Sequence, residues 1–344
     1  MITLIFRFFK SEYSLRISYK YWKNCEWTFP YNYDMMIMLG GLCEPPFSQH
    51  PTERTAHAMN KGKIGVQLNT LRNEIAQIGL YEALKRVSAM GFTAIEVSWL
   101  PMTPENIAQL QQAVADFGLE VAALGCGLHD ISPEIKYPGD TLQNNFDKIV
   151  ADCKTIGCSI VRIGSMPLAY CASPEEMLRC GDIMESYAER LAEHGIELHF
   201  HGHSFEFYRL DGIPVTTHIR NRTKYLKFEL DTHWMWRGGV DPVKYLPECA
   251  GRASILFLKD YKIGLLDTSI KWKLGEEHNM FGSIEQFAEV GEGVLDFPAI
   301  IPAGLDAGIQ YFLLEQDETY GKSAFDSLAV SRDNLIRMGY GDWF

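Results

Sequence analysis

The sequence predicts one α/β domain, a single (β/α)8 TIM barrel, preceded by an irregular N-terminal extension. Short runs rich in Ile, Val, Leu and Phe alternate eight times with helical patterns after residue 62. Such alternation is typical of parallel strands joined by right-handed crossovers, and eight units in about 280 residues fit a closed barrel better than an open sheet. No GxGxxG or P-loop motif follows the first strand, which disfavours a nucleotide-binding open sheet.

The strands and the helix ends can be placed in order. Residues with side-chain oxygens, Thr103, Ser173 and Asp241, each precede a proline and are expected to begin a helix. Glycines close the preceding helices, as left-handed stops do. The expected strands are 64–68, 94–98, 120–124, 160–164, 197–201, 226–231, 255–259 and 311–315, and the stop glycines are Gly91, Gly118, Gly157 and Gly195.

Residues 1–58 form a separate prediction. They contain many aromatic residues but no sustained helix or strand periodicity, and regular patterning begins directly after Met59. We therefore expect 1–58 to be an extension outside the fold and 59–344 to be the barrel. A targeting or docking arm is disfavoured, because Arg7 interrupts the apolar start and no cleavage site follows it.

Composition limits the partners. The formal net charge of -12 opposes binding to phosphate backbones, so nucleic acid is not expected. No run of eighteen apolar residues occurs, so no membrane span is expected. The eight cysteines form no CxxC pair and no secretion signal is recognisable, so we expect reduced thiols and a cytoplasmic location.

In a barrel the chemistry lies at the carboxyl ends of the strands. Strand 197–201 alternates so that His199, His201 and His203 share the inward face, with Glu206 following. Three histidines exceed what core packing needs, so His201 and His203 are predicted catalytic residues, and a structural role is the simpler interpretation of His199.

Two further strands end in carboxylates. Asp231 lies at the rim of strand 226–231, while Lys227 and Glu229 lie deeper and are expected to neutralise each other. Glu315 ends an apolar run that a solvated loop would not need, and we predict that it is functional. Lys259 lies at the end of the expected strand 255–259 and is a predicted catalytic residue.

Other residues near the strand ends are predicted to touch substrate. These are His129, Trp99, Trp234 and His233, among which the indoles suit the apolar faces of sugar rings. Glu96 is interpreted as structural. Carboxylates and imidazoles that converge from several strands also suit a divalent cation, namely Mn, Mg, Co or Zn. A lid or a subunit contact is expected in the insertion 261–289, which contains Trp272, Phe281 and Phe287.

The residues at these strand ends resemble those of the xylose isomerase-like superfamily, which contains sugar phosphate isomerases and epimerases. The resemblance covers about 63–344 and rests on KIGVQL at 63–68, HGHSFEF at 201–207, ELDTHW at 229–234, LKD at 258–260, GEGVLD at 291–296 and LEQD at 314–317. It implies that Glu206, Asp231 and Glu315 hold the metal. The fourth ligand of the superfamily is a histidine, and Phe257 stands at that position, so His203 or His233 is expected to complete the set.

The resemblance also implies an activity. In the superfamily the metal chelates neighbouring hydroxyl and carbonyl oxygens, and a carboxylate or histidine moves the proton through an enediolate. An isomerase or epimerase, acting as a homo-oligomer on a sugar, is therefore expected. Glu206 and Glu315, or one of them with a histidine, would serve as the two bases.

Two alternatives remain open. The HxHxxE pattern of the fifth strand is also similar to lyases that cleave 3-oxo-glycosides, including the large subunits of C-glycoside-cleaving enzymes, which pair with a small β-rich subunit. In such a lyase His201 or His203 would trigger elimination. A sugar-binding barrel without catalysis is the third interpretation, because Phe257 replaces an expected ligand.

Overall fold

The computed structural model describes residues 13–19, 22–29, 61–132, 134–265 and 284–344. The chain divides into two compact units, Met1–Met59 and Asn60–Phe344. In the first unit, β1 (Tyr13–Tyr19) and β2 (Trp22–Phe29) pair as an antiparallel hairpin. Sequence periodicity did not predict this hairpin; its strands are rich in aromatic and β-branched residues, which favour strands even without strict alternation.

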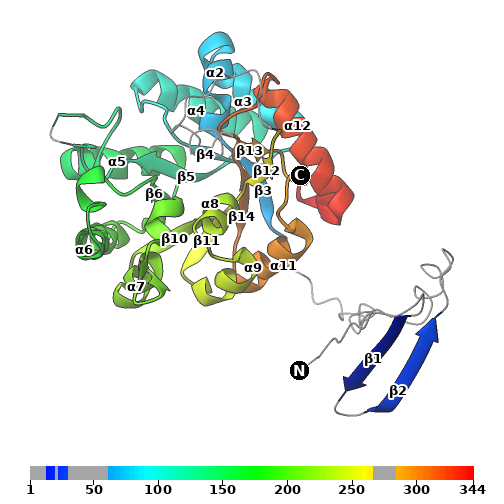
Figure 1. Cartoon of the computed structure of the whole chain (residues 1–344). Coiled ribbons are helices and arrows are strands. Elements are labelled where there is room, and N and C mark those ends of the chain that lie inside the picture. The colour runs from blue at the N-terminus through cyan, green and yellow to red at the C-terminus, as the bar shows by residue number, and fades with distance from the viewer. Residues whose placement is uncertain (1–12, 20–21, 30–60, 133, 266–283) are drawn as a thin grey trace, which may run out of the picture. The chain divides into compact units, whose positions relative to one another are not determined.

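In the second unit, eight parallel strands close into a barrel in the order β10-β11-β14-β3-β4-β5-β6-β7 (Figure 1). All eight overlap the expected strands, so the predicted barrel is confirmed. Pairing of β14 with β3, in which Leu313 lies beside Gly65, joins the last strand to the first. The strands are β3 (Lys63–Gln67), β4 (Ala94–Val97), β5 (Glu120–Cys126), β6 (Ile160–Ile163), β7 (Glu197–His201), β10 (Lys227–Asp231), β11 (Ala253–Leu258) and β14 (Tyr311–Leu314).

Helices surround the ring of strands (Figure 1). The side chains of Thr103, Ser173 and Asp241 accept hydrogen bonds from first-turn amides, which confirms the three predicted helix starts. The helices are α2 (Arg72–Ile78), α3 (Leu80–Ala89), α4 (Pro104–Phe117), α5 (Leu142–Ile156), α6 (Pro174–Ala192), α7 (Val215–Arg222), α8 (Thr232–Arg237), α9 (Pro242–Tyr245), α11 (Phe297–Ala307) and α12 (Ala324–Leu335), and the predicted stops Gly91, Gly118, Gly157 and Gly195 all have positive φ.

Strand alternation separates two apolar layers. On β11, Leu256 and Leu258 belong to the large core between strands and helices, whereas Ile255 and Phe257 belong to a smaller cluster inside the barrel. Since side chains alternate along a strand, Lys259 follows Phe257 on the inward side. This alternation directs Lys259, the residue after β11, into the mouth of the barrel.

The sequence predicted no membrane span and reduced cysteines. Among the residues that the structure describes, no helix is both long enough and apolar enough to span a bilayer. Six cysteines of the barrel unit are free thiols in the part of the chain that the structure describes, namely Cys126, Cys153, Cys158, Cys171, Cys180 and Cys249.

The inserted segment after β11 is only partly described. β12 (Asp260–Ile263) pairs antiparallel with β13 (Glu285–Ala288). Trp272 and Phe281, which were expected to form a lid or subunit contact, lie outside the described residues, whereas Phe287 lies on β13. Its ring centroid is 5.2 Å from Lys259 Nζ. The described part of the insertion therefore covers one side of the strand ends.

Asp260 fastens this region to the barrel. Its fully buried carboxylate accepts hydrogen bonds from the amides of Tyr261, Gly291, Gly293, Val294 and Leu295 at 2.8 to 3.1 Å. A Cβ on Gly293 would lie 2.3 Å from Asp260 Oδ1, so only glycine allows this approach. The GEG motif at 291–293 therefore forms a turn whose two glycine amides donate hydrogen bonds to the buried Asp260 carboxylate.

We expect Asp260→Asn to lower the free energy of unfolding by about 2 to 4 kcal/mol, because an amide nitrogen cannot accept the bonds from Gly291 and Gly293. Urea denaturation measures the change. Asp306→Asn, at an exposed position, is the matched control and should have little effect. Equal stability of the two variants would contradict the proposed role of the Asp260 carboxylate.

Candidate active site at the barrel mouth

Four neighbouring strands bring the main site residues together. β7, β10, β11 and β14 stand side by side in the barrel, and His201 and Asp231 end the first two, while Lys259 and Glu315 follow the last two. One ligand atom from each of His201, Asp231 and Glu315 lies within 4.8 Å of the other two. The predicted convergence of Asp231 with Glu315 is present, and His201 joins them.

Lys259 lies among the carboxylates of the site. Its Nζ is 2.9 Å from Glu315 Oε2, 2.5 Å from Asp317 Oδ2 and 3.8 Å from Asp231 Oδ2. Burial alone would lower the pKa of Lys259, but these three carboxylates raise it above its ordinary value. Lys259 is therefore an ammonium group at neutral pH. It can donate hydrogen bonds or stabilise negative charge.

His201 and Asp231 each have a buried side-chain atom without a hydrogen-bond partner among the described residues. Burial, followed by the nearby Arg162 guanidinium, holds the pKa of His201 well below its ordinary value, so the ring is neutral. Within the described part of the chain, its Nδ1 has no hydrogen-bond partner. Asp231 Oδ1 accepts the Trp234 amide at 3.0 Å, and Oδ2 has no such partner among the described residues. Burial raises the pKa of Asp231 to about 7, although Lys259 opposes this shift.

This donor set fits a divalent cation. A neutral imidazole and two carboxylates are the mixed nitrogen and oxygen ligands that Mn, Mg, Co and Zn accept. Asp231 Oδ2 is buried and has no hydrogen-bond partner among the described residues, and a bound cation would satisfy it. His201, Asp231 and Glu315 are therefore the residues that could hold the ion.

A buried ion-pair group lies below these residues in the barrel. Arg162 Nε is 2.9 Å from Glu229 Oε1 and 3.5 Å from Glu96 Oε1. Burial and then Glu96 raise the pKa of Glu229 well above its ordinary value, although Arg162 opposes this shift. Glu229 Oε1 also lies 3.5 Å from His201 Nδ1. This group positions the His201 ring from below.

The expected pairing of Lys227 with Glu229 is wrong. Lys227 instead pairs with Glu197, at the amino ends of β10 and β7, and Glu229 pairs with Arg162. The reason is depth in the barrel: Lys227 begins its strand and reaches the amino-terminal rim. Arg162 was missed by the sequence analysis, although an arginine between Val161 and Ile163 in an apolar strand was a usable signal.

Glu206 and His203 were predicted metal ligands, and the structure does not bring them into the cluster with Asp231 and Glu315. Glu206 is fully buried in the short helix η3 (Ser204–Phe207), where its carboxylate accepts the amides of Met166, at 2.7 Å, and His203. Those bonds use the carboxylate to cap the loop. The His203 ring packs edge-on against His201, with centroids 5.1 Å apart.

Phe257 fills the interior where the superfamily histidine was expected. Its buried ring lies edge-on to His201, with centroids 5.1 Å apart, and under the Arg162 guanidinium at 5.7 Å. His233, one expected substitute ligand, stacks on Phe287 with centroids 4.8 Å apart, and burial lowers its pKa to about 3. The imidazole of the cluster is instead His201, from β7.

A cavity of about 550 Å³ opens beside the cluster. Of the predicted residues, it is lined by Trp99, His129, His201, His203, Lys259 and Glu315. Trp234 and His233, predicted to touch substrate, are not in its lining; the Trp234 ring lies 5.1 Å from Lys259 Nζ. Polar lining residues that the sequence analysis did not name as site residues are Gln67, Asn69, Tyr137, Arg162, Ser165 and Asp317.

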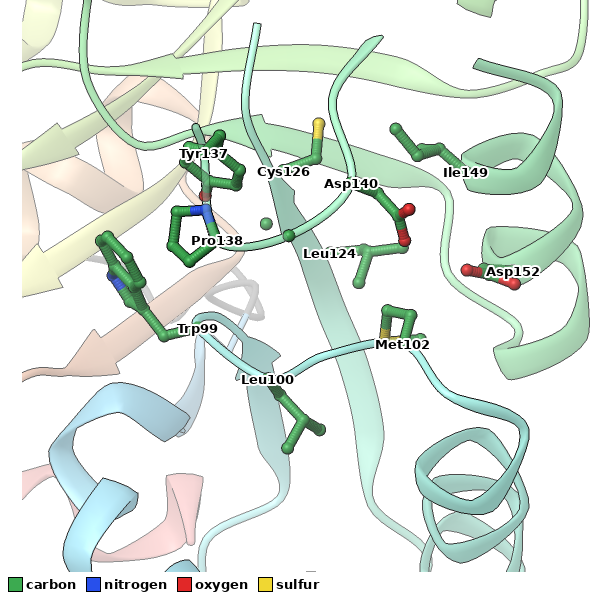
Figure 2. Close-up of a pocket in the computed structure, with 12 residues that line it drawn as sticks. Trp99, Leu100, Met102, Leu124, Cys126, Tyr137, Pro138, Asp140, Ile149 and Asp152 are labelled. Atoms are coloured by element: carbon green, nitrogen blue, oxygen red, sulfur yellow. The ribbon is translucent and has the colours of Figure 1, made fainter. Parts of the chain in front are cut away.

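A second pocket of about 50 Å³ adjoins this cavity and shares Trp99, Cys126 and Tyr137 with it. Figure 2 shows Trp99 and Tyr137 on one side of this pocket and Asp140 with Asp152 on the other. Both carboxylates accept hydrogen bonds from Lys148 Nζ at 2.7 Å. The small pocket has room for a few water molecules and not for a sugar.

Comparisons with known proteins agree with this architecture. A family model described as xylose isomerase-like TIM barrel matches residues 84–330. A comparison with curated proteins found no match. At these identities, the structural similarities below show the fold alone.

Three solved structures illustrate the similarity. A sugar phosphate isomerase/epimerase from Parabacteroides distasonis ATCC 8503 is 19% identical with a TM-score of 0.61, covering 84% of this chain and 98% of that one. An L-ribulose 3-epimerase is 17% identical with a TM-score of 0.58, covering 82% and 95%. The probable 3-DHS dehydratase AsbF from Bacillus anthracis is 17% identical with a TM-score of 0.56, covering 80% and 98%.

Proposed function

The chain belongs to the xylose isomerase-like TIM barrel family, and from this premise we propose that it is a metal-dependent sugar isomerase or epimerase. The reaction would move a proton at the carbon next to a carbonyl group. The observation that carries the proposal is the convergence of His201, Asp231 and Glu315 beside Lys259 at the end of a cavity of about 550 Å³.

The cluster would stabilise the negative charge that develops on the substrate oxygen. A divalent cation held by His201, Asp231 and Glu315 would polarise the substrate carbonyl and make the neighbouring C–H group more acidic. Lys259, whose Nζ lies 2.9 Å from Glu315 Oε2, would donate a hydrogen bond to the oxygen that gains negative charge. Lys259 also holds the carboxylate of Glu315 in place at 2.9 Å.

Proton transfer needs a side chain that reaches the cavity and is not bound to the cation. His203 lines the cavity, its side chain is 31% exposed, and the neutral His201 ring supports it edge-on. We therefore assign His203 as the base that moves the proton. His201 orients the site and holds the cation.

The test is deuterium exchange in D2O with a panel of ketoses, aldoses and keto-sugars and added Mn²⁺. We expect deuterium to enter at the carbon next to the carbonyl, and His203→Gln to slow this exchange by about 10²- to 10⁴-fold. His194→Gln, at an exposed helix end outside the cavity lining, is the matched control. Product formed without deuterium would contradict proton transfer.

Elimination is the second candidate. The same base would remove a proton next to a keto group, and a substituent on the following carbon would leave. This candidate is favoured by one observation: the cavity lining includes the apolar side chains of Trp99, Ile131 and Leu168, which could contact an apolar leaving group. Release of an aglycone from a 3-oxo-glycoside, together with a small co-purifying subunit, would support the lyase; a homo-oligomer active on free sugars would support the isomerase.

A further inference from the structure

We propose that the cavity contains an apolar subsite for an aryl or alkyl substituent of an uncharged sugar. This inference deepens the proposed function and rests on it in one respect, since the sugar ring is taken to lie against Lys259 and Glu315. The subsite names a substrate class: keto-sugars that carry an apolar group, in contrast to sugar phosphates. Simple phenyl and methyl pyranosides serve as binding probes of the subsite.

The barrel topology gives the cavity two unlike walls. Lys259, Glu315 and Asp317 follow β11 and β14, whereas most other lining residues follow β4, β5 and β6. Arg162, on β6, is the charged member of this second group. In the closed ring, β5 stands opposite β11, so the second wall faces Lys259. Its side chains are mainly aromatic or aliphatic, namely Trp99, Leu128, Ile131, Tyr137, Pro167 and Leu168.

Two residues of this apolar wall are unusually exposed. Trp99 is 59% exposed and Leu168 is 62% exposed, although both are large and hydrophobic. Both line the cavity, so their exposed apolar side chains border a concave site. Apolar surface arranged in this way favours a ligand with an apolar group.

The position of Trp99 is held at a conformational cost. Its φ of 55° lies in the left-handed region, which is unfavourable for an aromatic residue. Its indole stacks on Tyr137, with ring centroids 6.0 Å apart and planes 29° apart. Figure 2 shows these two side chains together on one side of the small pocket. The pair forms a flat aromatic surface on the apolar wall.

The charges of the cavity disfavour a phosphate group. The cationic side chains in its lining are Arg162 and Lys259, and both are occupied. Arg162 pairs with Glu229 and Glu96, while Lys259 contacts Glu315, Asp317 and Asp231. These carboxylates outnumber the two cations, and even a bound divalent cation leaves no excess of positive charge. An uncharged substrate therefore fits better than a sugar phosphate.

The experiment compares affinities by isothermal titration calorimetry with the full chain and Mn²⁺. The probes are phenyl and methyl pyranosides of glucose, galactose, mannose and xylose, and the corresponding sugar phosphates. We expect at least one phenyl pyranoside to bind about tenfold more tightly than its methyl partner, because the ring buries apolar area. The phosphates should bind more weakly than the phenyl pyranosides.

Trp99→Ala and Leu168→Ala are each expected to reduce the ratio of phenyl to methyl affinity to about threefold or less. Trp236→Ala is the matched control, since Trp236 is 44% exposed but does not line the cavity. Equal affinities of phenyl and methyl pyranosides, tighter binding of phosphates, or absence of binding by every phenyl pyranoside would each overturn the inference.

The outcome is separable from that of the proposed function. If the phenyl advantage is present and depends on Trp99, but no sugar exchanges deuterium, the subsite stands and the isomerase proposal fails. If free sugars exchange deuterium and phenyl pyranosides bind no better than methyl ones, the isomerase proposal stands and the subsite fails.

Discussion

Replacing Glu315 by glutamine is expected to lower kcat/KM by about a thousandfold and to leave the fold intact. Glutamine keeps the shape of the side chain but removes the charge that pairs with Lys259 at 2.9 Å and that would bind the cation with Asp231. Lys259 keeps its contact with Asp317, so the ammonium is still compensated. Steady-state kinetics and circular dichroism measure the two effects.

Glu318→Gln is the matched control for this experiment. Glu318 lies three residues further on and is exposed, and its side chain is not in the cavity lining. Its replacement should leave kcat/KM within about twofold of the wild type. Full activity of Glu315→Gln would remove Glu315 from the mechanism, whereas equal losses in both variants would indicate an indirect effect on the loop after β14.

Lys259→Met is expected to have the second large effect, on both stability and activity. It leaves Glu315, Asp317 and Asp231 without their shared cation, and breaking a buried ion pair from one side typically costs about 3 to 5 kcal/mol. Because Lys259 has a raised pKa, its stabilising contribution is present at neutral pH and is lost only at alkaline pH, above the ordinary lysine range. kcat/KM should fall about a hundredfold or more.

Lys259→Arg separates the two roles of the lysine. Arginine keeps the positive charge and should restore most of the stability measured by urea denaturation. Its wider planar group cannot take the same position between Glu315 and Asp317, so kcat/KM should remain low. Full activity of Lys259→Met, or stability of Lys259→Met equal to the wild type, would show that the carboxylate cluster does not depend on the ammonium.

The barrel was predictable because its evidence is local. Each strand is a short apolar run, and each predicted cap is a polar residue before proline, as in Thr103 and Ser173. Asp231 and Glu315 were predictable for the same reason, since parallel strands place their carboxyl ends at one rim. The hairpin of β1 and β2 was missed, because its strands lack regular alternation.

The rest of the site depends on geometry that spacing does not contain. Glu206 matches a family motif, but it lies past the end of β7, where the turn aims its carboxylate at the amides of Met166 and His203. His201 was predicted as a catalytic residue, and its proximity to Asp231 and Glu315 emerges only from the closed barrel. The contact of Phe257 with His201 likewise joins strands that are not consecutive in the sequence.

The central claim is that His201, Asp231 and Glu315 form one cation site at the barrel mouth. Equilibrium dialysis of the full chain against Mn²⁺ tests it most directly, with Asp231→Asn and Glu318→Gln as the site variant and its control. The account predicts about one bound ion per chain in the wild type and in Glu318→Gln, and at least about tenfold weaker binding in Asp231→Asn. No bound ion in the wild type, or equal binding by Asp231→Asn, would contradict it.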